Sequence, residues 1–250
     1  MPPQAHLFRR GCGLPPKDRA EPEEGSKAPR QPSRPFLDDV ELTRGQMLDV
    51  ERFPDSAALR ALATADELEE YTYLVAGSVG AFWTEVCVDE LGEEVFAEER
   101  ETMIARGVAY GKGLQLVNVL RDVAQDAQLG RCYLPTEELG GEAGLGQRLE
   151  SGYGEVAECF ARWMGCCSER LEHGVGYLEA ITPWRLKYAT ALPLLFAGST
   201  LARLREADWE KRKEGIKISR REVKSVMARA AAAALRRGGI ESLYRRLSRG

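Results

Sequence analysis

A helical repeat of apolar side chains runs from Phe36 almost to the C-terminus, and β-type alternation is scarce. Apolar residues that recur every three to four positions mark one face of an amphipathic helix. The pattern predicts helices at Ser56–Leu62, Asp66–Val88, Glu98–Asp126, Gly154–Ile181, Pro183–Leu204 and Arg220–Ser248, with a Gly-rich loop at Glu137–Gly146. Asp66 and Glu69 fit a capping box, and Thr182 before Pro183 fits a helix start. We therefore predict an all-α fold.

The first 35 residues differ in composition from the rest of the 250-residue chain. Met1–Pro35 is rich in Pro, Arg, Lys, Glu and Gly and has almost no aromatic residue. Such a segment buries too little apolar surface to offset the entropy lost on ordering. We predict a disordered tail at 1–35 and one helical domain at 36–250.

Charge and cysteine content exclude several classes of function. The net charge of −4 shows no basic excess of the kind that nucleic-acid-binding proteins carry. Six cysteines without a CxxC pair favour neither a disulfide framework nor a zinc site. No signal peptide is evident, and the most apolar stretch, Tyr188–Leu204, is too short to span a membrane. These features predict a cytoplasmic protein, and its basic C-terminal helix is either a solvated face or a weak contact with an anionic membrane.

The segment Gly111–Pro135 carries the most informative polar residues. Gln115, Asn118, Asp122 and Asp126 follow one another at intervals of three, four and four residues. On a helix this spacing places all four side chains along one stripe. The neighbouring positions, such as Leu120 and Val123, are apolar, so much of this helix is expected to be buried.

Two carboxylates on a partly buried stripe favour a bound cation. Both are ionised at neutral pH, and their mutual repulsion is relieved by a divalent metal. Mg²⁺ prefers one or two protein carboxylates together with water and phosphate oxygens. The stripe therefore suggests a Mg²⁺–diphosphate site, although a solvated helix face with Asp122 and Asp126 exposed explains the spacing equally well.

Three motifs in order resemble the squalene/phytoene synthase family. NVLRDVAQDAQLGRCYLP, at Asn118–Pro135, is similar to the family's second aspartate-rich motif. YTYLVAGSVGAFW, at Tyr71–Trp83, resembles its tyrosine–valine–alanine–glycine helix, and KISRREV, at Lys217–Val223, resembles its basic segment near the C-terminal end. The resemblance covers about Phe36–Ser248 and implies an isoprenoid (terpenoid) synthase helical bundle.

The resemblance also implies a prenyltransferase reaction and the residues that carry it. Family members join two prenyl diphosphates head to head (1′–1), commonly two farnesyl diphosphates to presqualene diphosphate and squalene, with Mg²⁺ as cofactor and NADPH where squalene is the final product. By position, Asp122 and Asp126 would be metal ligands and, with Tyr71, catalytic. The substrate would be bound by Gln115, Asn118, Arg121, Arg131 and Tyr133 around the diphosphate and by Val75 and Val79 along the prenyl chain.

One family motif has no match in this sequence. The first aspartate-rich motif, which holds the other metals, lies upstream of the matched region, so the chain resembles an N-terminally truncated member. Losing part of the groups that stabilise the departing diphosphate predicts weakened activity. Two alternatives stay open beside the farnesyl reaction: a phytoene-type synthase that uses geranylgeranyl diphosphate, and a catalytically silent homologue that partners a full-length synthase.

Overall fold

The computed structural model describes residues 39–54 and 58–249. They belong to one compact unit, Phe36–Gly250. The tail predicted at 1–35 and the first residues of the helix predicted at Ser56–Leu62 lie outside the described residues.

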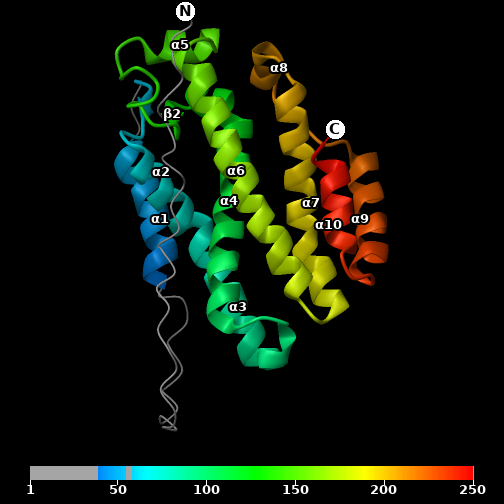
Figure 1. Ribbon diagram of the computed structural model, residues 1–250. Helices are drawn as coiled ribbons and strands as arrows, with labels where there is room; N and C mark the ends of the chain where they lie inside the picture. The colour runs from blue at the N-terminus through cyan, green and yellow to red at the C-terminus, as the bar shows by residue number, and fades with distance from the viewer. Residues whose placement is uncertain (1–38, 55–57, 250) are drawn as a thin grey trace, which may run out of the picture. The chain divides into compact units, whose positions relative to one another are not determined.

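The described residues are almost entirely helical, as predicted (Figure 1). In chain order the elements are α1 (Asp39–Arg52), β1 (Arg60–Ala61), α2 (Ala65–Thr72), the π-helical turn η1 (Tyr73–Gly77), α3 (Ser78–Leu91), the 3₁₀ turn η2 (Glu93–Val95), α4 (Arg100–Gln128), β2 (Arg131–Cys132), α5 (Leu145–Ser151), α6 (Glu155–Ala180), α7 (Trp184–Glu206), α8 (Trp209–Glu214), α9 (Arg220–Ala234) and α10 (Gly239–Leu247).

The long helix α4 is the central element of this arrangement. It lies along α6 and also contacts η1, α3 and α7 (Figure 1). Its buried side chains include Met103, Leu116 and Leu120, each with no exposed surface. Between these buried positions, Gln115, Asp122 and Asp126 of the predicted polar stripe are half-buried and Asn118 is exposed.

Glycines let α3 and η1 approach the backbone of α4 closely. A Cβ atom added at Gly80 would lie 2.0 Å from the Gly107 carbonyl oxygen, and one at Gly111 would lie 2.1 Å from the Ala76 carbonyl oxygen. No side chain fits at such distances, so this contact requires glycine on both helices. It fixes the register between the helix that carries Tyr71 and the helix that carries the acidic stripe.

The helix predicted at Ser56–Leu62 is wrong over its described part. Arg60–Ala61 is a short strand that pairs in parallel with Arg131–Cys132. Arg60 N donates to Gly130 O at 3.0 Å, and Leu62 N donates to Cys132 O at 3.1 Å. These partners are far apart in sequence, so the apolar spacing of a short segment did not reveal them.

Two predicted helix starts are displaced by one or two residues. The N-cap of α2 is Thr64 rather than Asp66, and its hydroxyl accepts from Glu67 N at 3.2 Å. The Glu67 carboxylate in turn accepts from Ala63 N at 2.7 Å, one residue before the N-cap. Pro183 is the N-cap of α7 instead of its first helical residue.

The single helix predicted at Arg220–Ser248 is two helices. It breaks between α9 and α10 at Gly238, which has a left-handed φ of 67°. Gly239 then lies so close to the previous turn that a Cβ atom there would be 2.2 Å from the Ala233 carbonyl oxygen. The Arg-Arg-Gly-Gly sequence before Ile240 is therefore a turn.

None of the helices within the described ranges is long and apolar enough to cross a membrane. The most apolar stretch of the sequence lies in α7, which has Pro193 inside it and contacts α4, α6, α9 and α10.

Candidate functional site

The first half of the predicted polar stripe contacts Tyr71. Gln115 Nε2 donates to the Tyr71 hydroxyl at 3.3 Å, and Asn118 Nδ2 donates to Gln115 Oε1 at 3.3 Å. Tyr71 is buried at the end of α2, directly before the π-helical turn η1. Such turns are frequent at functional sites because they shift the side chains that follow. The structure thus brings together three residues that the sequence analysis selected.

Tyr71 also stacks on Tyr133, which extends the network to α1. The two ring centroids are 4.5 Å apart and the planes are inclined by 22°. The Tyr133 hydroxyl donates to the two carboxylate oxygens of Asp49 at 3.1 and 3.2 Å. Burial raises the pKa of Tyr71 above its ordinary value, and the neighbouring Tyr133 and Asp49 raise it further. Tyr71 therefore stays a neutral hydrogen-bond donor.

Asp49 is a site residue that the sequence analysis missed. It lies on α1, far from Tyr133 in sequence, and no spacing rule connects the two. Burial raises the pKa of its carboxyl, while the hydrogen bond from Tyr133 and the charge of Arg131 lower it. The missed signal is one of the two acids in the segment GQMLDVERF, which sequence reasoning alone cannot separate from a surface residue.

The two predicted metal ligands lie further along α4 and are half-buried. Arg121 Nε donates to Asp122 Oδ1 at 2.8 Å, so Asp122 is already paired with a cation. Desolvation by burial raises the pKa of Asp126 to about 6, and the negative charges of Asp122 and Asp49 add to this effect. The positive charges of Arg131 and Arg121 act in the opposite direction.

This donor set fits a magnesium ion that is shared with phosphate. Asp126 is held where its ionised form is disfavoured, and a nearby divalent cation would remove that cost. Throughout the described part of the chain no group of three or more His, Cys, Asp and Glu side chains is arranged to hold a metal. The site therefore suits Mg²⁺ that takes only one or two carboxylates and completes its shell with water and phosphate oxygens.

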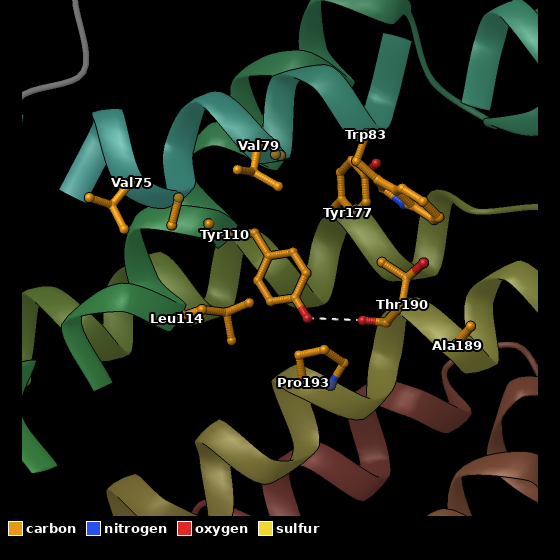
Figure 2. A pocket seen from close by; sticks show the side chains of 13 residues that line it. Val75, Val79, Trp83, Tyr110, Leu114, Tyr177, Ala189, Thr190 and Pro193 are labelled. Carbon is orange, nitrogen blue, oxygen red and sulfur yellow. Dashed lines mark hydrogen bonds between the residues drawn. The ribbon is translucent and has the colours of Figure 1, made fainter. Parts of the chain in front are cut away.

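An apolar cavity of about 380 Å³ lies beside the same helices (Figure 2). Val75 and Val79, both predicted to contact a prenyl chain, line it together with Leu114, which is the neighbour of Gln115 on α4. The remaining lining residues come from α3, α4, α6 and α7: Gly80, Trp83, Gly107, Tyr110, Gly111, Tyr177, Ala189, Thr190 and Pro193, with Ala76 from η1. The cavity thus begins four residues after Tyr71, next to the polar network.

The family model described as squalene/phytoene synthase matches residues 28–222, which is more than half of the chain. This chain belongs to the squalene/phytoene synthase family. The family performs head-to-head condensation of prenyl diphosphates and uses a divalent metal, Mg²⁺, to bind the diphosphate. The resemblance seen in the sequence motifs is therefore confirmed for the family, and the all-α synthase fold is confirmed with it.

Curated relatives of this squalene/phytoene synthase family member are phytoene synthases. The chloroplastic phytoene synthase of Narcissus pseudonarcissus is 40% identical over 112 residues, which cover 45% of this chain and 23% of the relative. The bifunctional lycopene cyclase/phytoene synthase of Arthroderma gypseum is 31% identical over 117 residues, covering 47% of this chain and 18% of the relative. The chain thus spans under a quarter of these relatives' length.

Solved structures of squalene synthases share the fold of this family member. The ligand complex of TcSQS with BPH1237 superposes with a TM-score of 0.62 at 17% identity, covering 83% of this chain and 57% of that one. The squalene synthase HpnC from Alicyclobacillus acidocaldarius gives a TM-score of 0.54 at 20% identity, covering 67% and 58%. The match therefore supports the fold, and the chain spans under two thirds of both structures.

Proposed function

We propose that this chain condenses two prenyl diphosphates head to head, with two farnesyl diphosphates giving presqualene diphosphate and squalene. The observation that carries this proposal is the position of the apolar cavity. It lies along α4 next to Gln115, where the stripe of amides and acids begins, so one ligand with a long apolar chain and a highly charged head can extend from the cavity along the stripe.

The charged head is proposed to bind along the second half of α4. Asp122 and Asp126 would hold Mg²⁺, which when bound supplies charge stabilisation for the departing diphosphate. Arg121 and Arg131 bring positive charge to the same place, and both affect the pKa of Asp126. Gln115 and Asn118 offer amide groups to phosphate oxygens, since among the described residues their side chains bond to each other and to Tyr71 alone.

Tyr71 and Tyr133 are proposed to act at the junction of head and chain. Tyr71 remains protonated because burial raises its pKa, so its hydroxyl can donate to the departing diphosphate. Tyr133 holds the Tyr71 ring by stacking and is itself held by Asp49. Val75 and Val79 line the cavity next to Tyr71 and are proposed to contact the reacting end of the prenyl chain.

The test is binding and turnover with Mg²⁺ and farnesyl diphosphate. We expect Asp122→Asn to lower turnover by about 10²–10³-fold, the loss typical for one group that stabilises developing charge. Asp89→Asn is the matched control, because Asp89 lies on α3 with 67% of its side chain exposed. Unchanged binding and turnover in Asp122→Asn and in Asp126→Asn would contradict the proposal.

Two alternatives are separated by the same assay. The curated relatives favour a phytoene-type reaction, in which geranylgeranyl diphosphate replaces farnesyl diphosphate. The other alternative is a silent homologue, which would bind the substrates without forming product and would bind a full-length synthase. Omitting NADPH distinguishes products, since only squalene formation needs a reductant. A cytoplasmic location and a peripheral membrane contact stay predictions.

A further inference from the structure

The two ends of the apolar cavity differ in the side chains that close them. Val75, Val79 and Trp83 follow one another at four-residue intervals and line the cavity in that order. Figure 2 shows Val75 and Leu114 at one end, and Trp83 together with Tyr177 and Ala189 at the other. The end near the polar network is therefore aliphatic, whereas the far end carries two large aromatic rings.

Tyr177 is fixed in place by its hydroxyl group. It lies 2.9 Å from the Thr84 hydroxyl, which itself donates to the Gly80 carbonyl oxygen at 2.9 Å. Tyr177 is therefore the donor to Thr84, and this bond ties α6 to α3. Only 1% of Tyr177 is exposed, and its ring centroid lies 5.7 Å from that of Phe96. If the ring rotated away from the cavity, its buried hydroxyl would lose its hydrogen bond.

Tyr110 strengthens the same end of the cavity from α4. Its hydroxyl donates to the Thr190 carbonyl oxygen at 2.9 Å, and its ring centroid lies 6.2 Å from that of Tyr177. Trp83 differs from both, because 41% of it is exposed and its indole has no fixed partner in the hydrogen bonds of the described residues. It lines the far end of the cavity with part of its ring in solvent.

The volume of the cavity indicates the size of chain that fits into it. A cavity of about 150 Å³ in a protein interior holds one benzene molecule. The cavity here is about 380 Å³. By the same ratio it holds roughly 15 carbon atoms, the size of one farnesyl chain. A geranylgeranyl chain is one isoprene unit longer and would have to pass Trp83.

We infer that Trp83, backed by Tyr177, forms the end wall of the prenyl pocket and limits it to a chain of farnesyl length. The inference rests on the proposed function, since it treats the cavity as the site of a prenyl chain. It adds the residues that decide which chain is accepted. Trp83 is the residue to change, because Tyr177 and Tyr110 are held by buried hydrogen bonds.

The experiment measures the affinities of farnesyl and geranylgeranyl ligands for the wild type and Trp83→Ala. The probes are the non-reactive thiolodiphosphates with Mg²⁺ and, separately, the prenyl alcohols, each measured by equilibrium dialysis. We expect the wild type to bind the longer chain no more tightly than the shorter one. In Trp83→Ala the ratio of the two affinities should rise roughly tenfold or more in favour of geranylgeranyl, because each further buried methylene contributes about fourfold.

Trp184→Ala is the matched control. The exposed fraction of Trp184, 44%, is similar to that of Trp83, 41%, but Trp184 does not line the cavity. Its removal should therefore leave the ratio unchanged. Should Trp83→Ala fold poorly, Trp83→Leu keeps apolar bulk and should shift the ratio in the same direction by less. Two results would overturn the inference: a wild type that prefers the geranylgeranyl chains, or an affinity ratio that is unaltered in both Trp83→Ala and Trp83→Leu.

The two kinds of probe separate this inference from the proposed function. The alcohols carry no diphosphate, so they report the length of the cavity even if the charged site fails. Loss of metal-dependent thiolodiphosphate binding with an intact chain-length effect on the alcohols would refute the proposed function and uphold the end wall. Metal-dependent binding of both thiolodiphosphates with no change of the affinity ratio in Trp83→Ala would support the proposed function and refute the end wall.

Discussion

Around Asp122 and Asp126 the groups near α4 are charged and half-buried, whereas around Tyr110 they include the buried ring of Tyr177 from α6. Asp126 and Asp122 lie at the first place without enough positive charge to keep the pKa of Asp126 low. Tyr110 and Tyr177 lie at the second place with every hydroxyl paired. The charged region therefore disfavours the ionised form of Asp126, whereas the two hydroxyls of the aromatic region are hydrogen-bonded.

The two regions are joined by one feature of the backbone. η1 and α3 pass from Tyr71 to Trp83 and rest on α4 through the glycine contact at Gly80 and Gly107. Any change in that contact moves both regions together. Changes to side chains at one end should, by contrast, affect one class of ligand contact only, and this difference makes the comparison testable.

The largest expected effect comes from filling the glycine contact. Gly80→Val places a side chain where a Cβ atom already lies 2.0 Å from the Gly107 carbonyl oxygen. We expect the free energy of unfolding to fall by about 3 kcal/mol, since overpacking against backbone cannot be relieved by a rotamer change. Urea denaturation measures this loss. Binding of prenyl alcohols and of thiolodiphosphates should fall together.

Gly165→Ala is the control for this variant. Gly165 also lies within a helix, α6, but no atom lies within 4 Å of the position of its Cβ. Replacing it should raise the free energy of unfolding by about 0.5–1 kcal/mol, because glycine is the more flexible residue in the unfolded chain. If Gly80→Val were as stable as Gly165→Ala, the backbone contact would not hold the two regions in register.

A smaller effect, confined to the charged region, is expected at Asp49. Asp49→Ala removes the acceptor of the Tyr133 hydroxyl, so Tyr133 is free to turn away from Tyr71. Leaving a buried hydroxyl unpaired costs about 1–3 kcal/mol, which corresponds to about tenfold or more in affinity for the thiolodiphosphate. Asp49→Asn keeps an acceptor oxygen and should restore most of that affinity.

Prenyl alcohols provide the contrast for Asp49. They contact the cavity alone, so their affinity should stay unchanged in Asp49→Ala. An equal loss for alcohols and thiolodiphosphates would mean that Asp49 supports the whole fold instead of positioning Tyr133 at the charged end.

Sequence patterns predicted the elements that depend on local spacing. The helix expected at Glu98–Asp126 occurs at Arg100–Gln128, and Tyr71, Gln115 and Asn118 form one hydrogen-bonded group. What the patterns missed depends on contacts between distant segments. The β1–β2 pair and the Asp49–Tyr133 bond join residues about 70 to 84 positions apart, and periodicity within one segment contains no information about such partners.

The cavity is a second case of this kind. Val75 and Val79 were selected because they share a helical face with Tyr71, and both line the cavity. Tyr177 and Tyr110 were not selected, because a buried tyrosine in an amphipathic helix is ordinary core packing until the opposite wall is known. The depth of the cavity depends on α6 and α7 and cannot be read from the motif at Tyr71–Trp83.

The smallest expected effect lies between the two regions, at Glu69. Glu69 lies two residues before Tyr71, and its carboxylate forms ion pairs with Lys112 of α4 and Arg170 of α6. Burial alone would raise the pKa of Glu69, but the two cations outweigh it and the net pKa is lowered. A lowered pKa means that the ion pairs stabilise the fold above the pKa of the unfolded chain, near 4.5, and that this contribution is lost as the pH falls through the lower pKa of the folded state.

We therefore expect Glu69→Gln to lower the free energy of unfolding by about 1 kcal/mol at pH 7, after allowance for screening by solvent. The difference from the wild type should shrink as the pH falls through the lowered pKa of Glu69, because the wild type loses the same ion pairs once that carboxylate is protonated. Denaturant titrations of both proteins at pH 7 and in acid test this expectation. Glu70→Gln is the control, since its carboxylate is half exposed and lies 3.8 Å from Arg44. A difference that persisted in acid would mean that Glu69 acts through packing, and the cations would then contribute nothing to joining the charged region to the aromatic one.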